Sequence, residues 1–512
     1  MTSGAALAVT AVGLVAVLAL AVGAFGLRFS RTTSDFYVAS RTVRPAANAA
    51  AISGEYLSAA SFLGVAGLVA SRGPDMLWYP VGYTAGYLLL LLFVAAPLRR
   101  SRAYTLPDFA EFRLESPRAR GLASAMVVLI CVLYLLPQFR GAGLTLRTLT
   151  GAPDWLGSAI VAVLVLLGVA AGGMRSITLV QAVQYWLKLA ALLVPLAFLL
   201  VRAHGGAPAA HDRLVRTDWL EPMQGPHSLY LTYSLILATF LGAMGLPHVA
   251  VRFYTNRDGH AARRTTVAVL VLLSLFYLLP PVYGALGHRY LSGVSASDST
   301  DTTDLVVLRL PHHLIGGLGA DALTAVLGAG AFAAFLSTSS GLVLSIAGVL
   351  GQDLLGRRLP AVPAFRLAAV AAALGTFVLT VLTTGLAVAH AVELAFTVAA
   401  STFCPLLLLG IWWRGLTAAG AMAGMAVGGA LSTGAILAVM TGSHSASLSG
   451  AVLSQPAMVT VPAAFAVMIG VSLATRDHRP PRLARIMVRL HTPEAVQVDR
   501  SGFRARGALD QS

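Results

Sequence analysis

Residues 49–64 read AAAISGEYLSAASFLG, an apolar run that is interrupted by Ser53, Gly54 and Glu55. As part of a helix that crosses a bilayer, this run would place the glutamate near the middle of the membrane, where a carboxylate is costly. Glycine weakens a helix, and serine competes for its backbone groups. We therefore expect an irregular helix here and a role for Glu55 in a substrate pathway. The alternative is a glutamate that is protonated or hydrogen-bonded inside a helical bundle.

The composition of the whole chain supports a membrane setting for this run. Of the 512 residues, 57% are hydrophobic and 11% are charged, and the mean hydropathy is +0.77. Soluble proteins carry about 25% charged residues, so this chain lacks the polar surface of a soluble globule of its length. We expect an all-helical protein embedded in a lipid bilayer.

The apolar runs predict about thirteen membrane-spanning helices. They lie near residues 5–27, 46–70, 76–98, 121–139, 156–173, 177–201, 228–250, 265–290, 321–350, 364–389, 391–412, 417–441 and 456–475. The first run lacks a basic start and is followed at once by Arg28 and Arg31, which favours an uncleaved helix over a signal peptide. No soluble domain is predicted between the spans.

The net charge of +15 comes almost entirely from arginine. With the N-terminus outside the cell, 27 arginines fall in the predicted cytoplasmic segments and 8 fall in the outer ones. This asymmetry is the positive-inside signal of a multi-pass membrane protein. It predicts an outside N-terminus and an inside C-terminus in a bacterial cytoplasmic membrane, and it removes the need for a nucleic-acid partner.

The sequence lacks the motifs of several enzyme classes. The only lysine, Lys188, lies in an apolar run and not after a phosphate-binding glycine loop, no histidine begins an HExxH motif, and GxSxG is absent. Cys131 and Cys404 both lie in hydrophobic stretches and predict neither a disulfide framework nor a metal cluster. We expect a protein that is not an enzyme and that uses no organic cofactor.

Two further stretches depart from a smooth apolar pattern. Residues 240–248 read FLGAMGLPH, which predicts a kink or an unwound segment. Residues 333–341 read AAFLSTSSG, whose four consecutive hydroxyls supply oxygen ligands suited to an alkali cation. If helices 2–6 and 7–11 are inverted five-helix repeats, the interrupted second helix (46–70) and the interrupted seventh helix (228–250) occupy matching positions, as at the binding site of a secondary transporter.

The segment from Tyr104 to Arg120 mixes aromatic and basic residues. It predicts either an amphipathic piece along the inner membrane surface or a solvated loop with a helical turn. Lys188 is deeper than a loop residue should be, and both snorkelling and a partner such as Glu393 remain open for it.

In these motifs the chain resembles the sodium/solute symporter family, and within it the cation/acetate (monocarboxylate) symporters. The matching pieces are 52–64, 105–109 (TLPDF), 138–143 (QFRGAG), 172–174 (GGM), 245–254 (GLPHVAVRFY) and 335–341 (FLSTSSG). The resemblance implies a five-plus-five inverted-repeat fold of the neurotransmitter/sodium symporter type. It divides the chain into 1–45 (first helix and linker), 46–412 (transport core), 413–475 (two further helices) and 476–512 (tail).

The resemblance also implies a sodium site between the second and ninth helices. Its ligands would be the backbone carbonyls of Ala49, Ile52 and Ala334 and the hydroxyls of Ser337 and Thr338. A set of neutral oxygens suits a monovalent ion, and a divalent ion would favour carboxylates. Some family members carry a polar or acidic residue at the position of Ala51, so any role of that side chain is absent here.

We expect a sodium-coupled symporter that imports small monocarboxylates such as acetate, propionate or pyruvate. The substrate carboxylate would lie near the broken helices, around Ser53, Gly54, Tyr56, Gln138, Gly245 and His248. Arg140 would draw anions into an outer vestibule or simply snorkel to the interface. The alternatives are transport of proline, another amino acid or a sugar, or proton coupling through Glu55, and more remotely a membrane enzyme or sensor. The sequence leaves the oligomeric state open.

Overall fold

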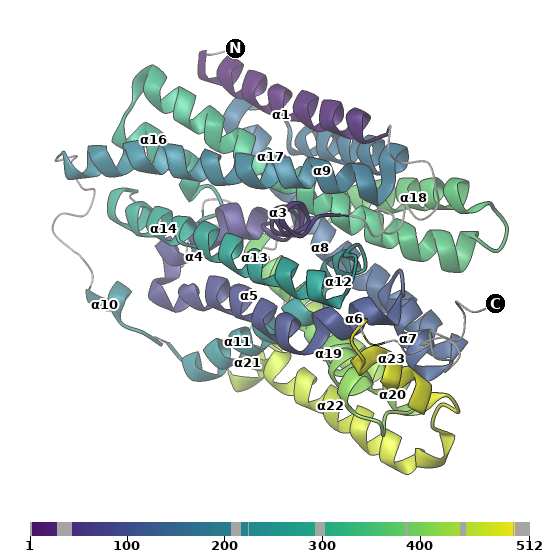
Figure 1. Cartoon of the computed structure of the whole chain (residues 1–512). Coiled ribbons are helices and arrows are strands. Elements are labelled where there is room, and N and C mark those ends of the chain that lie inside the picture. The colour runs from purple at the N-terminus through teal and green to yellow at the C-terminus, as the bar shows by residue number, and fades with distance from the viewer. Residues whose placement is uncertain are drawn as a thin grey trace.

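The computed structural model describes residues 3–27, 43–205, 217–223, 225–291, 303–383, 388–440, 447–494 and 496. Residues 28–42 of the predicted linker, with Arg28 and Arg31, and the tail beyond residue 496 lie outside the described residues. The described part of the chain is helical throughout, with no strand, and this confirms the predicted fold class (Figure 1).

The helices, with short π- or 3₁₀-helical turns marked η, follow one another along the chain. They are α1 (Ser3–Leu27), α3 (Pro45–Tyr56), η2 (Ala60–Gly64), α4 (Val65–Arg72), η3 (Pro74–Leu77), α5 (Trp78–Leu89), η4 (Leu90–Val94), α6 (Ala95–Ser101), α7 (Leu106–Leu114), α8 (Pro117–Thr150), α9 (Asp154–His204), α10 (Thr217–Leu220), α11 (Ser228–Gly245), α12 (Pro247–Phe253), α13 (Gly259–Tyr277), α14 (Leu279–Tyr290), α16 (Val306–Leu314), α17 (Gly317–Leu350), η5 (Gly351–Leu355), α18 (Ala361–Leu382), α19 (Val388–Trp412), α20 (Ala418–Met440), α21 (Leu448–Ser454), α22 (Ala457–Ala474), η6 (Arg476–His478) and α23 (Leu483–His491).

The predicted spans coincide with the long apolar helices. Among the described residues, 11 helices are long and apolar enough to cross a membrane, and one bent pair, Pro45–Tyr56 with Ala60–Arg72, brings the number to 12. The shorter apolar helix Asp154–Ala170 corresponds to the predicted fifth span. The exact number of crossings and the inverted repeat stay predictions.

The predicted fifth and sixth spans meet without a loop inside α9. The backbone bends at Gly173, whose φ of 57° and ψ of −156° lie outside the helical region. Only glycine adopts such angles without a steric cost, because its Cα carries no side chain. One residue therefore joins two apolar helices.

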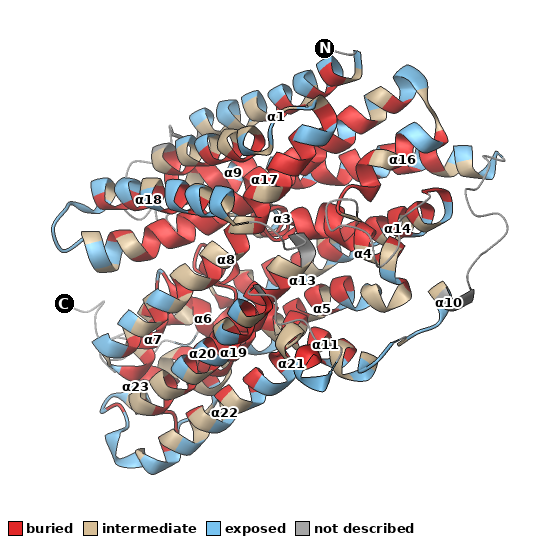
Figure 2. Cartoon of the chain, turned by 180° about the vertical axis from the view of Figure 1, so that it is seen from behind, coloured by how far each residue is buried: buried red, intermediate tan, exposed pale blue. Residues whose placement is uncertain are grey.

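Burial separates central from peripheral helices (Figure 2). In the most apolar windows of α17 and α19, 94% and 89% of the residues are buried, against 22% in α1 and 33% in α18 and α22. α1 packs against α9 and α17, whereas α20 and α22 pack together on the opposite side of the bundle (Figure 1). Chemistry is thus expected beside α17 and α19, because there polar groups are shielded from lipid.

The segment after Tyr104 is not a solvated loop. Thr105 caps α7, since its hydroxyl accepts from the Asp108 backbone and the Asp108 carboxylate accepts from the Thr105 backbone. Phe109 and Arg113 of α7 are fully buried, and Arg113 donates to the Gly410 carbonyl oxygen over 2.6 Å. The solvated-loop alternative was therefore wrong, because tertiary packing takes up the aromatic face, and a position along the inner membrane surface stays a prediction.

Candidate functional site

The helix that begins at Pro45 is broken after Tyr56. Leu57 has a ψ of 85°, outside the helical region, and the chain resumes as η2 and α4 at an angle of 71° to α3. We call residues 57–59 the α3–α4 break. The predicted irregularity is confirmed, but Ser53, Gly54 and Glu55 lie in the last turn of α3 and not in the break itself.

A second break separates α11 from α12. Leu246 takes extended backbone angles, with φ −68° and ψ 120°, between Gly245 and Pro247. Proline at the first position of α12 restarts the helix with its φ already set and without an N–H that would need a partner. The interruption predicted from residues 240–248 is confirmed.

Gln138 of α8 accepts a hydrogen bond from a backbone N–H group in the α3–α4 break. Its Oε1 accepts from the backbone N–H of Ala59 over 3.1 Å. Inside a bilayer no water is present to satisfy such a group, so a side chain has to replace the lost helical bond. Gln138 was predicted to bind substrate, and the bond to Ala59 explains why an amide is buried at this position. Arg140, two residues further along α8, is half-buried.

Lys188 of α9 donates hydrogen bonds to backbone carbonyl groups at the same break. Its Nζ donates to the carbonyl oxygens of Gly54 and Leu57, the latter over 2.8 Å, and to Ser337 Oγ over 2.9 Å. An ammonium has three donors, and all three are used. Neither sequence alternative for Lys188 was right, since the side chain is fully buried and does not snorkel, and Glu393 instead bonds Tyr79 and His390.

Glu55 forms an ion pair with Arg252 of α12. Arg252 Nε lies 2.5 Å from Glu55 Oε2, and the exposed fractions of the two side chains are 1% and 2%. Arg252 also donates to Thr178 Oγ1 over 2.7 Å and to Gln181 Oε1. Glu55 is thus hydrogen-bonded inside the bundle, as the alternative reading expected. Arg252 is one of the 27 arginines counted in the predicted cytoplasmic segments, and this assignment was wrong because Arg252 is buried within the bundle.

Most of these partners come from one face of α9 that the sequence analysis missed. Thr178, Gln181 and Lys188 recur at intervals of three and seven residues, which brings them to the same side of a helix. A polar stripe on an otherwise apolar span was the signal that could have identified them.

The residues implied for sodium are all buried on α3 and α17. They are Ala49, Ile52, Ala334, Ser337 and Thr338. Thr338 Oγ1 donates to the Glu55 carbonyl oxygen over 2.6 Å, and Ser337 Oγ donates to the Ala334 carbonyl oxygen over 3.0 Å. The α17 members therefore lie against the last turn of α3 and the break that follows it, and their role as ligands stays a prediction.

An aromatic cluster fills the space beside both breaks. We call it the tyrosine cluster: Tyr56, Tyr79, Tyr83, Tyr87, Tyr134, Tyr277, His248 and Phe396. The rings of Tyr56 and Tyr87 are 4.8 Å apart, and those of Tyr134 and His248 are 5.2 Å apart. The cluster connects Tyr56 to His248, two predicted substrate residues on different helices.

Several polar atoms at this cluster have no hydrogen-bonding partner among the described residues. They are Tyr83 OH, Tyr87 OH and both ring nitrogens of His248, and Ser53 Oγ, one turn before Tyr56 on α3, is a further one. Buried polar atoms are nearly always paired, because an unpaired one costs free energy. Such a set is the environment that a polar ligand would complete.

Two predicted substrate residues have a packing explanation. A Cβ at Gly54 would overlap the Gln181 carbonyl oxygen, and one at Gly245 would overlap the Ala399 carbonyl oxygen. Glycine at these positions lets α3 approach α9 and lets α11 approach α19. Substrate contact at either glycine stays a prediction.

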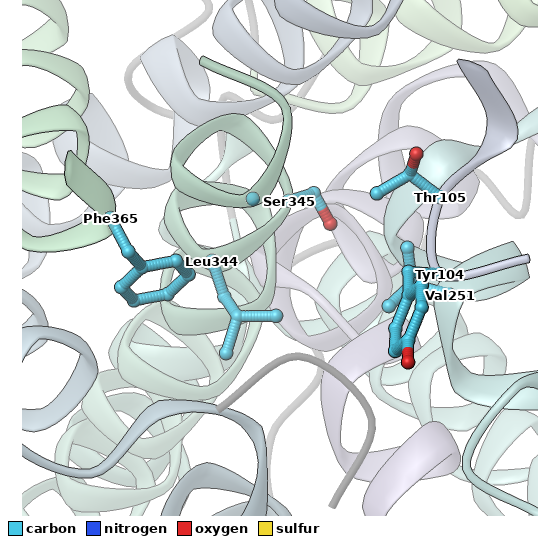
Figure 3. Close-up of a pocket in the computed structure, with 7 residues that line it drawn as sticks. Tyr104, Thr105, Val251, Leu344, Ser345 and Phe365 are labelled. Carbon is cyan, nitrogen blue, oxygen red and sulfur yellow. The ribbon is translucent and has the colours of Figure 1, made fainter. Parts of the chain in front are cut away.

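A separate pocket lies further along α17, towards the predicted cytoplasmic side. It measures about 240 Å³ including space open to its surroundings, and it is lined by Tyr104, Thr105, Val251, Leu344, Ser345, Gly348 and Phe365. Figure 3 shows the Ser345 side chain between Leu344 and Thr105. Ser345 lies eight residues after Ser337, which is about 12 Å along a helix.

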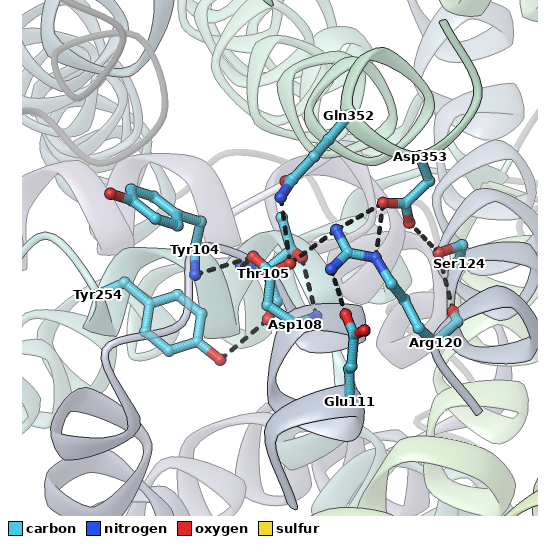
Figure 4. Close-up of polar contacts among 9 residues, drawn as sticks. All are labelled: Tyr104, Thr105, Asp108, Glu111, Arg120, Ser124, Tyr254, Gln352 and Asp353. Carbon is cyan, nitrogen blue, oxygen red and sulfur yellow. Dashed lines mark hydrogen bonds and ion pairs between the residues drawn. The ribbon is translucent and has the colours of Figure 1, made fainter. Parts of the chain in front are cut away.

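An ion-pair network lies next to this pocket. We call it the Arg120 network: Arg120 contacts Asp108 (2.9 Å), Glu111 (2.5 Å) and Asp353 (2.6 Å), and thereby joins α7, α8 and η5 (Figure 4). Burial raises the pKa of the Asp108 carboxyl above its ordinary value, although the Arg120 guanidinium opposes this shift. Gln352 adds a hydrogen bond to Asp108 over 3.3 Å.

Sequence comparison relates the chain to two bacterial transporters. The Uncharacterized symporter YwcA of Bacillus subtilis is 32% identical over 499 residues, covering 93% of this chain and 96% of that protein. The Monocarboxylic acid transporter of Corynebacterium glutamicum is 31% identical over 521 residues and covers 92% of each chain.

Structural comparison finds the same helical fold in known symporters. A Na⁺-coupled sialic acid symporter in a substrate-bound outward-open state matches with a TM-score of 0.71 at 14% identity, over 91% of this chain and 98% of that one. MHP1, a nucleobase-cation-symport-1 family transporter, matches with a TM-score of 0.52 at 13% identity, over 89% and 98%. The model of the sodium:solute symporter family matches residues 36–428. This chain is a multi-pass membrane protein that belongs to the sodium:solute symporter family.

Proposed function

We propose that this protein imports small monocarboxylates, such as acetate, propionate or pyruvate, across the bacterial cytoplasmic membrane in symport with sodium. The proposal includes an outside N-terminus, an inside C-terminus and a transport core at 46–412. The buried polar atoms of the tyrosine cluster carry the proposal, because they lie beside both helix breaks and have no hydrogen-bonding partner in the described part of the chain.

The charges at the α3–α4 break favour an anionic substrate. Glu55, Arg252 and Lys188 together carry one excess positive charge when all three are ionised, and all are buried. A monocarboxylate would balance this charge, whereas a sugar or a zwitterionic amino acid would not. The similarity to a protein named for monocarboxylic acid transport agrees with this choice.

Sodium would enter from the outside and bind beside Ser337 and Thr338. Hydroxyl and carbonyl oxygens are the ligands that a hard monovalent cation takes. Entry down an inside-negative potential supplies about 2.3 kcal/mol per charge for each 100 mV. Sodium at α17 would order the last turn of α3, which contains Ser53 and the cluster residue Tyr56.

The geometry disfavours the alternative in which Glu55 carries a proton. Protonation would neutralise the Glu55 carboxylate, the only one among the described residues that pairs with Arg252, and would leave a buried guanidinium without its counterion. Release to the inside would pass the pocket at Ser345, which the Arg120 network borders.

Radiolabelled acetate uptake into proteoliposomes tests the proposal. We expect uptake that requires an inward sodium gradient and is inhibited by propionate and pyruvate but not by proline or glucose. Uptake that ignores sodium and follows a pH gradient would contradict sodium coupling. Counterflow with proline or a sugar, in the absence of acetate counterflow, would contradict the substrate class.

A further inference from the structure

The only lysine of the chain shares one oxygen, Ser337 Oγ, with the sodium site that the family resemblance implies. Lys188 Nζ contacts two backbone carbonyls, of Gly54 and Leu57, and the Ser337 hydroxyl oxygen at 2.9 Å. No carboxylate in the described residues is hydrogen-bonded to it, so dipolar oxygens alone solvate the charge. Two carbonyls and a hydroxyl are also the kind of ligands that an alkali ion takes.

Ser337 connects this lysine to the predicted sodium site. Its hydroxyl proton points to the Ala334 carbonyl oxygen, at 3.0 Å, and its lone pairs face Lys188. A sodium ion bound to Ser337 would need the same lone pairs. Two positive charges on one hydroxyl oxygen would lie within a few ångströms of each other and repel strongly in a buried site.

The local charge balance makes joint occupancy still less favourable. Within the described part of the chain, Glu55 is the one carboxylate beside Lys188 and Ser337, and Arg252 already pairs with it at 2.5 Å. Lys188 adds a second positive charge, and sodium would add a third. One of the two cations beside Ser337 therefore has to leave when the other binds.

We propose that the Lys188 ammonium is a tethered cation that competes with sodium for the oxygens at the α3–α4 break. Without sodium, Lys188 donates hydrogen bonds to the carbonyl oxygens of Gly54 and Leu57 and so occupies the oxygens at the break. Sodium binding displaces the ammonium from Ser337. This inference rests on the proposed function only in taking the break as the site of the coupling ion.

The first test measures sodium binding by thermal stability of the purified protein in detergent, without substrate. NaCl is titrated against choline chloride at constant ionic strength for the wild type, Lys188→Met and Lys188→Gln. We expect the sodium concentration that gives half of the maximal rise in melting temperature to fall at least about tenfold in both variants. In the wild type Lys188 occupies the site most of the time, and the apparent affinity for sodium is reduced to the fraction of molecules in which the site is free. An unchanged or raised midpoint, or no sodium response in either variant, would overturn the proposal.

Gln184→Met is the matched control for these variants. Gln184 lies one turn before Lys188 on α9, is buried, and its amide has no partner among the described residues. The control removes a polar group of similar size without removing a cation, so its sodium midpoint should equal that of the wild type.

A second measurement uses the wild type and does not depend on a variant that folds. Because Lys188 is the only lysine, its reductive methylation by formaldehyde and cyanoborohydride can be followed on a single peptide by mass spectrometry. Sodium should speed this methylation relative to choline, since displacement frees the amine. Equal rates across the sodium range that raises the melting temperature would contradict displacement.

The two proposals can fail separately. If wild-type acetate uptake ignores sodium but Lys188→Met gains sodium-dependent stability, the proposed coupling fails and the competition is supported. If uptake requires sodium and the midpoint is unchanged in both lysine variants, sodium coupling stands and the competition is overturned.

Discussion

The molecule holds two arginine–carboxylate groups in very different surroundings. At the centre, Glu55 and Arg252 are 2% and 1% exposed. In the Arg120 network, the side chain of Arg120 is 22% exposed and that of Glu111 is 37% exposed. The central pair is cut off from water and salt, whereas the network is partly exposed to both.

Breaking the central pair should have the largest effect. Arg252→Met leaves Glu55 buried without a counterion, and we expect a loss of about 3–5 kcal/mol of stability. Fluorescence-detected gel filtration and melting temperature in detergent measure it. The double variant Glu55→Met/Arg252→Met should regain much of the loss, because neither charge remains. A single variant as stable as the wild type would mean that the pair is as dispensable as a surface one.

Removal of the Gln138 amide should come next. Gln138→Leu leaves the Ala59 N–H without the acceptor that it has at 3.1 Å, at a cost of about 1–3 kcal/mol. The melting temperature relative to Gln184→Leu, whose amide has no described partner, isolates the contribution of the bond. Equal losses in the two variants would show that the break does not depend on Gln138.

A change on α17 tests whether the central region binds a cation as well as holding a charge pair. Thr338→Ala should raise the sodium concentration for half-maximal acetate uptake about tenfold, the effect of about 1.4 kcal/mol. Thr376→Ala, a buried threonine of α18 whose hydroxyl has no partner among the described residues, is the control. An unchanged half-saturation in Thr338→Ala would refute the ligand assignment, and the same test applies to Ser337→Ala.

The smallest effect is expected in the Arg120 network. Asp353→Asn weakens one of three partly exposed pairs, so we expect a stability change of about 0.2–1 kcal/mol that shrinks as salt rises. Melting temperatures in 50 mM and 500 mM choline chloride would measure this change, concentrations chosen to vary the screening length severalfold. A loss as large as that of Arg252→Met, and independent of salt, would erase the contrast between the regions.

The sequence predicted the membrane helices and both broken helices for clear physical reasons. Long apolar runs must form helices in lipid, and Pro247 after Gly245 prevents a continuous hydrogen-bond ladder. The position of the first break was not predictable to the residue. Gly54 looked like a helix breaker, but it lies within α3. Glycine is needed there because α9 passes too close for a side chain.

The polar contacts of the site were less accessible to sequence reasoning. Glu55 and Arg252 are 197 residues apart, and nothing local to either identifies the other. Arg252 looked like an ordinary inner-face arginine because it follows an apolar run and precedes a basic segment. Likewise, the partners of Lys188 are mostly backbone oxygens, which exist at every position and become distinctive only where a helix breaks.

The bend at Gly173 has a mechanical consequence. Because one residue and not a loop joins the two helices of α9, their ends cannot move apart, while rotation about the backbone of Gly173 can change the angle between them. The second helix carries Gln181 and Lys188 against α3, whereas the first contains Ser158, which bonds the Phe139 carbonyl of α8 over 2.7 Å. Residues inserted at this joint would let the two helices separate and would loosen the connection between the contacts at α3 and those at α8.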